Sequence, residues 1–150
     1  MPIEGQCGVV NRKFEVHLIM YQIQRIVSGF SADTECSFGL VSGEKLIVAV
    51  SGGLDSMVLL YLLHHAGFKC IVAHVNYHLR GTDSDEDEAL VKAFCEAEII
   101  PFEVRHADPV AMRDGNLQDN ARVFRYNFFE EIREKYACRF VAVAHHKDDA

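Results

Sequence analysis

One short turn in the sequence combines residue types that bind anions. Ser51–Ser56 reads S-G-G-L-D-S and follows a buried apolar run, Leu46–Val50. A strand that ends in Ser-Gly-Gly and leads into a helix leaves backbone N–H groups unpaired at the positive end of the helix dipole, and Gly52 and Gly53 let an anion approach them. The turn therefore predicts an anion site, with phosphate as the expected ligand. The alternative is an ordinary strand-turn-helix in which Asp55 caps the helix.

A second group of polar residues follows the next apolar run. His74 and Asn76 close that run, and Tyr77–Arg80 reads Y-H-L-R. Given the first turn, we interpret His74 and Asn76 as part of a nucleotide site, the alternative being a strand end with polar residues in solvent. Zinc is not favoured at His74 and His78, because they fall on a strand and a loop with no thiol or third ligand near them.

Two arginines form a third group. Arg122 and Arg125 lie three residues apart in a helical pattern, so they are neighbours on one face. Their guanidinium groups could hold a phosphate, a ribose or a carboxylate. The alternative is that they are surface arginines that pair with the many acidic residues of the chain.

The last group is the string H-H-K-D-D at residues 145–149, which follows another buried run. Paired carboxylates such as Asp148 and Asp149 make sense beside a triphosphate mainly through Mg²⁺, which bridges the anions. The alternative is a charged loop that starts the next helix.

The elements that must position these groups alternate between strands and helices. Four strands are expected, at Leu46–Val50, Lys69–Val75, Ile99–Val104 and Phe140–Ala144. Helices are expected over Met57–Leu63, from about Asp85 to Glu98, and from Leu117 through Ile132. Residues 108–116 are expected to be irregular, residues 1–12 carry no signal, and Phe14–Phe30 has the spacing of a leading amphipathic helix.

Two of these helices have predicted inner faces. The first comprises Ala89, Leu90, Ala93, Phe94 and Ala97. The second comprises Leu117, Ala121, Phe124, Phe128 and Ile132, which leaves Arg122 and Arg125 free to face a ligand.

Alternating strands and helices predict an α/β fold with a doubly wound parallel sheet. With the strand order 3-2-1-4, the order reverses between Leu46–Val50 and Phe140–Ala144. Ligands of such sheets bind at this switch point, outside the carboxyl ends of the strands. The S-G-G-L-D-S turn and the H-H-K-D-D string should then face each other across one crevice.

Composition narrows the class of protein. The chain has 150 residues, enough for one domain, and a net charge of −7, which argues against a broad nucleic-acid-binding surface on this chain alone. Much of that charge lies in Asp83–Glu88, which we interpret as a solvated helix N-terminus because it lacks the spacing of a calcium loop. We expect no membrane span and no secretory signal, and the five scattered cysteines favour the reducing cytoplasm.

The turn at Ser51–Ser56 resembles the pyrophosphate loop of the ATP pyrophosphatases, or PP-loop enzymes. Together with H-V-N-Y-H-L-R, N-A-R-V-F-R-Y and A-H-H-K-D-D-A, it resembles the N-terminal catalytic domain of the bacterial tRNA(Ile)-lysidine synthetase family, from about Glu44 to Ala150. The resemblance implies an adenine nucleotide alpha hydrolase-like fold with the last strand missing. It also implies a ligase that uses ATP and Mg²⁺ to join free lysine to the wobble cytidine of the CAU anticodon of tRNA(Ile), through an adenylated base.

The resemblance also implies residue roles. The pyrophosphate should be cradled by Ser51, Gly52, Gly53, Leu54 and Ser56. Adenosine should be lined by His74 and Asn76, and phosphate or substrate should be met by Arg122 and Arg125. Adenylation and metal binding should involve Asp55, His146, Asp148 and Asp149, with Asp55 and Asp149 as the expected metal ligands and Asp55 alternatively capping the helix.

The sequence departs from the family pattern in two places. The second motif of the family often reads H-V-N-H-G-L-R, and Tyr77 and His78 replace its His-Gly pair. The family also continues beyond Ala150, so we expect a leading segment at residues 1–43 and a truncated catalytic domain at residues 44–150.

Three other functions stay open. A PP-loop tRNA thiolase should show C-x-x-C between the second and last motifs, where only Cys95 and Cys138 occur. An amidotransferase-type synthetase shares the first motif but not the A-H-H-x-D-D string. A nucleotide-binding fragment without full activity is the third. The oligomeric state is open as well, with a homodimer as one alternative.

Overall fold

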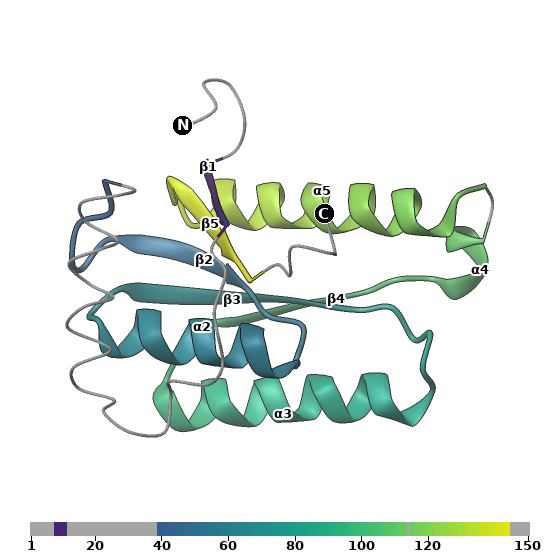
Figure 1. Cartoon of the computed structure of the whole chain (residues 1–150), viewed down its shortest axis with the longest axis horizontal. Coiled ribbons are helices and arrows are strands. Elements are labelled where there is room, and N and C mark those ends of the chain that lie inside the picture. The colour runs from purple at the N-terminus through teal and green to yellow at the C-terminus, as the bar shows by residue number, and fades with distance from the viewer. Residues whose placement is uncertain (1–7, 12–38, 114, 145–150) are drawn as a thin grey trace.

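The structure is a computed structural model that describes residues 8–11, 39–113 and 115–144, with side chains from residue 39 onward. Five parallel strands form one sheet in the order β1-β5-β2-β3-β4. The strands are β1 (Gly8–Asn11), β2 (Lys45–Ala49), β3 (Lys69–Asn76), β4 (Phe102–His106) and β5 (Phe140–Val143). The order β4-β3-β2-β5 is the predicted 3-2-1-4 order, so the fold class is confirmed (Figure 1).

Helices cover both faces of the sheet. Figure 1 shows α2 (Leu54–His65) and α3 (Thr82–Glu98) on one side and α5 (Leu117–Lys135) on the other. Alternate residues of β2 point to opposite faces, so Leu46 and Val48 join the core under α2 and α3, whereas Ile47 joins the core under α5. Burial on both faces explains why this strand reads as a continuous apolar run.

The segment predicted to be irregular contains one short helix, α4 (Pro109–Met112). Asp108 caps it, because its carboxylate accepts a hydrogen bond from the N–H of Val110 at 2.9 Å. Proline at the first helical position needs no N–H partner. The prediction for residues 108–116 was wrong at this point.

The predicted inner face of α3 was wrong except at Phe94, which is partly buried and packs against the core. The buried residues of this helix are Ser84, Val91 and Cys95, whereas Leu90 is 52% exposed. The helix also begins at Thr82, three residues before the predicted start. Asn76 of β3 stabilises the observed rotation of the helix about its axis, because its side-chain amide donates hydrogen bonds to the carboxylates of Asp85 and Glu88.

Strand β4 begins at Phe102 rather than at Ile99. Ile99 is the left-handed C-cap residue of α3, with φ of 55°, and it is 91% exposed. Pro101 has no N–H to donate, and only its carbonyl joins the sheet, accepting from the N–H of Val72 at 2.8 Å. The helix therefore extends to Glu98, and the strand starts after the proline.

Strand β1 was not predicted. It pairs in parallel with β5 at the edge of the sheet, from Gly8 opposite Phe140 to Asn11 opposite Val143. The predicted leading helix over residues 14–30 lies outside the described residues. Among the described residues, no helix has the length and apolar character needed to cross a bilayer.

Candidate functional site

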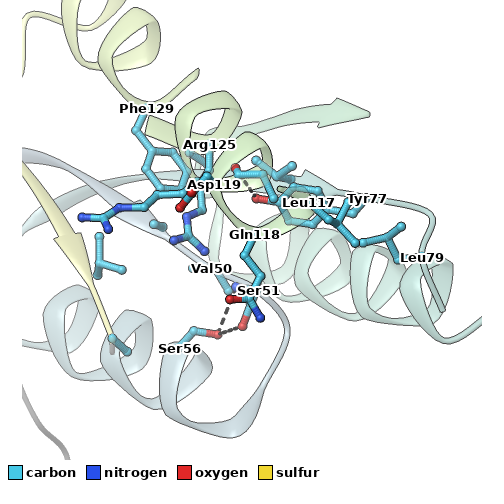
Figure 2. Close-up of a pocket in the computed structure, with 17 residues that line it drawn as sticks. Val50, Ser51, Ser56, Tyr77, Leu79, Leu117, Gln118, Asp119, Arg125 and Phe129 are labelled. Atoms are coloured by element: carbon cyan, nitrogen blue, oxygen red, sulfur yellow. Dashed lines mark hydrogen bonds between the residues drawn. The ribbon is translucent and has the colours of Figure 1, made fainter. Parts of the chain in front are cut away.

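A cavity of about 720 Å³ opens at the carboxyl ends of β2, β3 and β5. The strands line it with small side chains, among them Ala49, Ala73 and Val143, and we call this side the floor. The N-terminal half of α5 lines the other side as a roof (Figure 2). The chain leaves β2 toward α2, which covers the face of the sheet opposite α5. The segment that follows β2 therefore does not fill the space between the sheet and α5 at this point. The cavity thus lies at the predicted switch point between β2 and β5.

The S-G-G-L-D-S turn forms one end of this cavity through Ser51 and Ser56. The Ser56 hydroxyl donates to the carbonyl of Gly53 at 2.9 Å and accepts from the N–H of Ser51 at 3.1 Å. The hydroxyl oxygen of Ser51 accepts from the N–H of Gly53 at 3.3 Å. These bonds hold the turn in a closed loop at the start of α2.

Glycine is required at position 52. Gly52 is buried with φ of 93°, and a Cβ there would lie 2.8 Å from the Cβ of Asp87 on α3. Gly53 is the N-cap residue of α2, with no side-chain cap bond. Leu54 and Asp55 lie in the first turn of α2, so Asp55 is not the N-cap residue itself. The positive end of the helix dipole is thus adjacent to the turn.

Arg122 and Arg125 enter the cavity from α5, as their position off the buried stripe predicts. Both guanidinium groups flank Tyr126, at 5.8 and 5.6 Å from its ring centre. The Nε of Arg125 is buried and has no hydrogen-bond partner among the described residues. Because a buried donor without a partner is unfavourable, this geometry fits a site completed by an anionic ligand.

Sequence reasoning missed several residues of the cavity. They are Tyr77 and Leu79 in the loop after β3, and Leu117, Gln118 and Asp119 at the start of α5. Two signals were available. The loop follows a strand end, where ligands bind, and Asn116 caps α5 by accepting from the N–H of Gln118 at 3.1 Å, which places the first turn of that helix at the rim.

Tyr77 joins that loop to α5. Its hydroxyl donates to the carbonyl of Ala121 at 3.2 Å. Burial raises the pKa of Tyr77, and the positive charge and hydrogen bond of Arg125 partly offset this rise. The Tyr77 side chain thus joins the loop after β3 to the first half of α5 (Figure 2).

His74 and Asn76 are not brought to the cavity. Both are buried on the opposite face of β3, since alternation turns Ala73 and Val75 toward the cavity. The Nδ1 of His74 lies 2.7 Å from the carbonyl oxygen of Val50, and its Nε2 is buried without a hydrogen-bond partner in the described part of the chain. A role of these two residues at adenosine stays a prediction.

His78 occupies the position where the related motif has glycine. Its φ of 51° is in the left-handed region, which agrees with that preference. The Nε2 of His78 lies 2.7 Å from Nδ1 of His106, and the two rings stack. Within the described ranges, no group of three or more His, Cys, Asp or Glu side chains is placed to hold a metal ion.

His146, Asp148 and Asp149 lie outside the described residues, so their meeting with the turn stays a prediction. Strand β5 pairs with β2, with Val143 opposite Ala49. Val143 and Ala144 line the cavity. The described chain therefore reaches the cavity at its last two residues, Val143 and Ala144.

Comparison with known proteins identifies one family and a set of relatives. A family model described as PP-loop domain matches residues 19–150. The tRNA(Ile)-lysidine synthase of Bacteroides thetaiotaomicron is 41% identical over 110 residues, which cover 71% of this chain and 26% of that protein. The enzyme of the same name from Bacillus subtilis is 42% identical over 115 residues, covering 73% of this chain and 24% of that protein. The chain thus spans about a quarter of the length of these relatives.

Solved structures share the fold at low sequence identity. An NH3-dependent NAD synthetase from Campylobacter jejuni aligns with a TM-score of 0.57 and 11% identity over 79% of this chain and 55% of that chain. An NMN synthetase from Francisella tularensis aligns with a TM-score of 0.54 and 15% identity over 79% of this chain and 51% of that chain. These likenesses support the doubly wound sheet alone.

Proposed function

Because the chain belongs to the PP-loop family, whose model matches residues 19–150, we propose that it is the ATP-binding catalytic part of a tRNA(Ile)-lysidine synthase. The observation that carries the proposal is one shared cavity. Serines of the S-G-G-L-D-S turn and two arginines of α5 line it together, at the switch point of the sheet. The names of the relatives supply the substrate class.

In the proposed reaction, the carbonyl oxygen of the wobble cytosine attacks the α-phosphorus of ATP. The bond from this phosphorus to the bridging oxygen breaks, and pyrophosphate leaves. The ε-amine of free lysine then attacks the activated carbon, loses a proton and displaces AMP. The product is lysidine, and the sum is one ATP converted to AMP and pyrophosphate for each lysine joined.

The turn is proposed to bind the leaving pyrophosphate. Ser51 and Ser56 offer hydroxyl groups at the cavity, and Gly52 and Gly53 carry no side chain that would cover the N-terminus of α2. Backbone donors already held in place stabilise negative charge without reorganising during the reaction. Leu54, in the first turn of α2, is proposed to bind the pyrophosphate through its backbone rather than through its side chain.

The cavity itself fits a nucleotide substrate. Its volume of about 720 Å³ is in the range of small-molecule sites, and its floor is apolar while its arginines converge from one side. Arg122 and Arg125 are proposed to hold phosphate or a substrate carboxylate, which a guanidinium binds through two parallel hydrogen bonds. His74 and Asn76 are buried on the opposite face of β3, so the adenosine site proposed for them lies outside this cavity, at the carboxyl end of β3.

Mg²⁺ is proposed as the cofactor, held by Asp55 and Asp149 with help from Asp148 and His146. When bound, it would neutralise charge on the triphosphate. Asp55 lies in the first turn of α2, next to the pyrophosphate loop, which suits a carboxylate that meets a metal carried by the nucleotide. The other three residues extend the same proposal beyond Ala144.

The proposed partners are tRNA(Ile) with the CAU anticodon and free lysine. A net charge of −7 gives this chain little general attraction for a phosphate backbone. We therefore propose that tRNA is held largely by further parts of the protein, and that this chain acts on the anticodon base. Cytoplasmic location and homodimer formation stay predictions.

The test follows pyrophosphate release from ATP with the purified chain. A tRNA(Ile) transcript with the CAU anticodon is compared with one carrying GAU, each with and without lysine. AMP and lysidine should form only with the CAU transcript and lysine. Pyrophosphate release that needs a sulfur donor in place of lysine, or ammonia in place of tRNA, would identify a thiolase or an amidotransferase-type synthetase instead.

A further inference from the structure

We propose that Tyr77 is a positioning residue that holds the turn of α5 carrying Arg125 over the cavity, where this arginine meets an anionic group. This inference deepens the proposed function and rests on it. Tyr77 stands where the related motif usually has histidine, and no role for it follows from the pyrophosphate loop. Tyr77 lines the cavity together with Ser51 and Ser56, and it contacts α5 through Ala121.

The first observation is the bond between Tyr77 and α5. The Tyr77 hydroxyl donates to the carbonyl of Ala121 at 3.2 Å. Ala121 is one turn before Arg125, so this carbonyl belongs to the helical turn that carries the arginine. The bond fixes the distance between the loop after β3 and the part of α5 above the cavity (Figure 2).

The second observation is the surroundings of Arg125. Its positive charge offsets part of the rise that burial causes in the pKa of Tyr77, and both side chains line the cavity. Arg125 lines the cavity with its Nε buried and without a hydrogen-bond partner among the described residues. The arginine on the turn that Tyr77 holds therefore has a buried donor that an anion in the cavity could satisfy.

The third observation is how the loop is held from behind. His78 turns away from the cavity and contacts His106 at 2.7 Å, while its own N–H donates to the side-chain oxygen of Asn76 at 3.0 Å. Tyr77 and His78 thus point in opposite directions from a backbone tied on its outer side. A loop held in this way keeps the Tyr77 ring in place, which an orienting role requires.

The experiment is a double-mutant cycle on ligand binding. The full chain, Tyr77→Phe, Arg125→Gln and the double variant are titrated calorimetrically, with ATP in one arm and lysine in the other. Tyr77→Phe keeps the ring and removes only the hydroxyl. It should weaken binding about tenfold in the arm whose anion Arg125 meets, phosphate or carboxylate, and by less than about twofold in the Arg125→Gln background.

Tyr61→Phe is the matched control, because Tyr61 lies on α2 and does not line the cavity. It should bind both ligands like the unchanged chain. Tyr77→His, which keeps a hydrogen-bonding ring, is the second variant and should lose less affinity than Tyr77→Phe. Thermal unfolding of every variant separates loss of binding from loss of folding.

The outcomes separate the inference from the proposed function. If the unchanged chain binds neither ATP nor lysine, the proposed function fails and the inference fails with it. If it binds them and Tyr77→Phe has no effect in either arm, the inference alone is overturned. An effect of Tyr77→Phe that is equally large with and without the Arg125 side chain also overturns it, because Tyr77 would then act independently of Arg125.

Discussion

At the scale of single residues, Gly52 links the turn to the fold. Its φ of 93° disfavours any side chain, and a Cβ would meet the Cβ of Asp87 at 2.8 Å and its Cα at 3.2 Å. Gly52→Ala should lower the free energy of unfolding by about 2–4 kcal/mol, the sum of backbone strain and overpacking. Urea unfolding measures this change.

Gly43→Ala is the matched control for this prediction. Gly43 has a similar φ of 84°, but nothing lies within 4 Å of a Cβ placed there. Only the strain remains, so we expect a loss of about 1–2 kcal/mol. Equal losses at the two positions would contradict the proposed contact between the turn and α3.

The sequence predicts the direction of some side chains of the site but not of others. The spacing of Arg122 and Arg125 correctly predicts that they share one face toward the cavity. The direction of His74 could not be predicted in the same way. Alternation places it opposite Ala73, but which of the two faces stays open depends on where α5 packs, and that is a tertiary contact. Tyr77 was missed for the same reason, since its partner Ala121 is far away in sequence.

At the scale of elements, α5 divides into two halves. Its C-terminal half packs on the sheet through Phe128 and Ile132, whereas Leu117 is exposed at the other end. Of the predicted stripe, only the second half is fully buried, because the first half roofs a cavity. Phe128→Ala should lower the free energy of unfolding by about 3–5 kcal/mol, whereas Val123→Ala, at 59% exposure, should change it by less than about 0.5 kcal/mol. Urea unfolding of both variants tests this division.

The C-terminal end of α5 is tied to β4 through Glu103, which accepts hydrogen bonds from Lys135 at 2.6 Å and Tyr136 at 2.7 Å. The hydrogen bond of Lys135 lowers the pKa of Glu103 below its usual 4.5, with burial opposing this and Tyr136 adding to it. A carboxyl with a lowered folded pKa stabilises the fold above the unfolded pKa and loses this contribution as the pH falls through the folded pKa.

Stability should therefore fall on acidification below about pH 4.5, and Glu103→Gln should remove part of that slope. The change should stay below about 1 kcal/mol, because Lys135 is largely exposed and solvent screens the pair. Urea unfolding at pH 7, 5, 4 and 3 measures it. Glu96→Gln, an exposed carboxylate of α3, is the control, and equal slopes for the two variants would refute the assignment.

Elements also show where periodicity fails. The sequence of α3 offers two overlapping apolar stripes, since alanines are tolerated on either face of a helix. The hydrogen bonds from Asn76 to Asp85 and Glu88 stabilise the rotation of the helix in which Val91 and Cys95 are buried. These bonds join a strand to a helix, so no helical periodicity contains them. The start of β4, by contrast, could have been predicted from Pro101.

At the scale of the whole molecule, the strand order and the position of the cavity follow from the sequence. Buried runs that alternate with helices allow few topologies, and parallel crossovers are right-handed. The edge strand β1 does not follow, because Gly8–Asn11 is a four-residue segment whose pairing with β5 is non-local. A short strand without a recurring apolar pattern is recognisable only by its partner.

The whole molecule also responds to its ligand. A ligand that binds only the folded state adds about 2.7 kcal/mol at a concentration 100 times its Kd. For a chain of 150 residues, ATP should then raise the unfolding midpoint by about 5–10 °C. Ala49→Leu places a larger side chain on the cavity floor and should abolish this rise, whereas Ala93→Leu, on the exposed side of α3, should preserve it. Differential scanning fluorimetry of both variants with and without ATP measures this rise. An unchanged rise in Ala49→Leu would place the nucleotide outside this cavity.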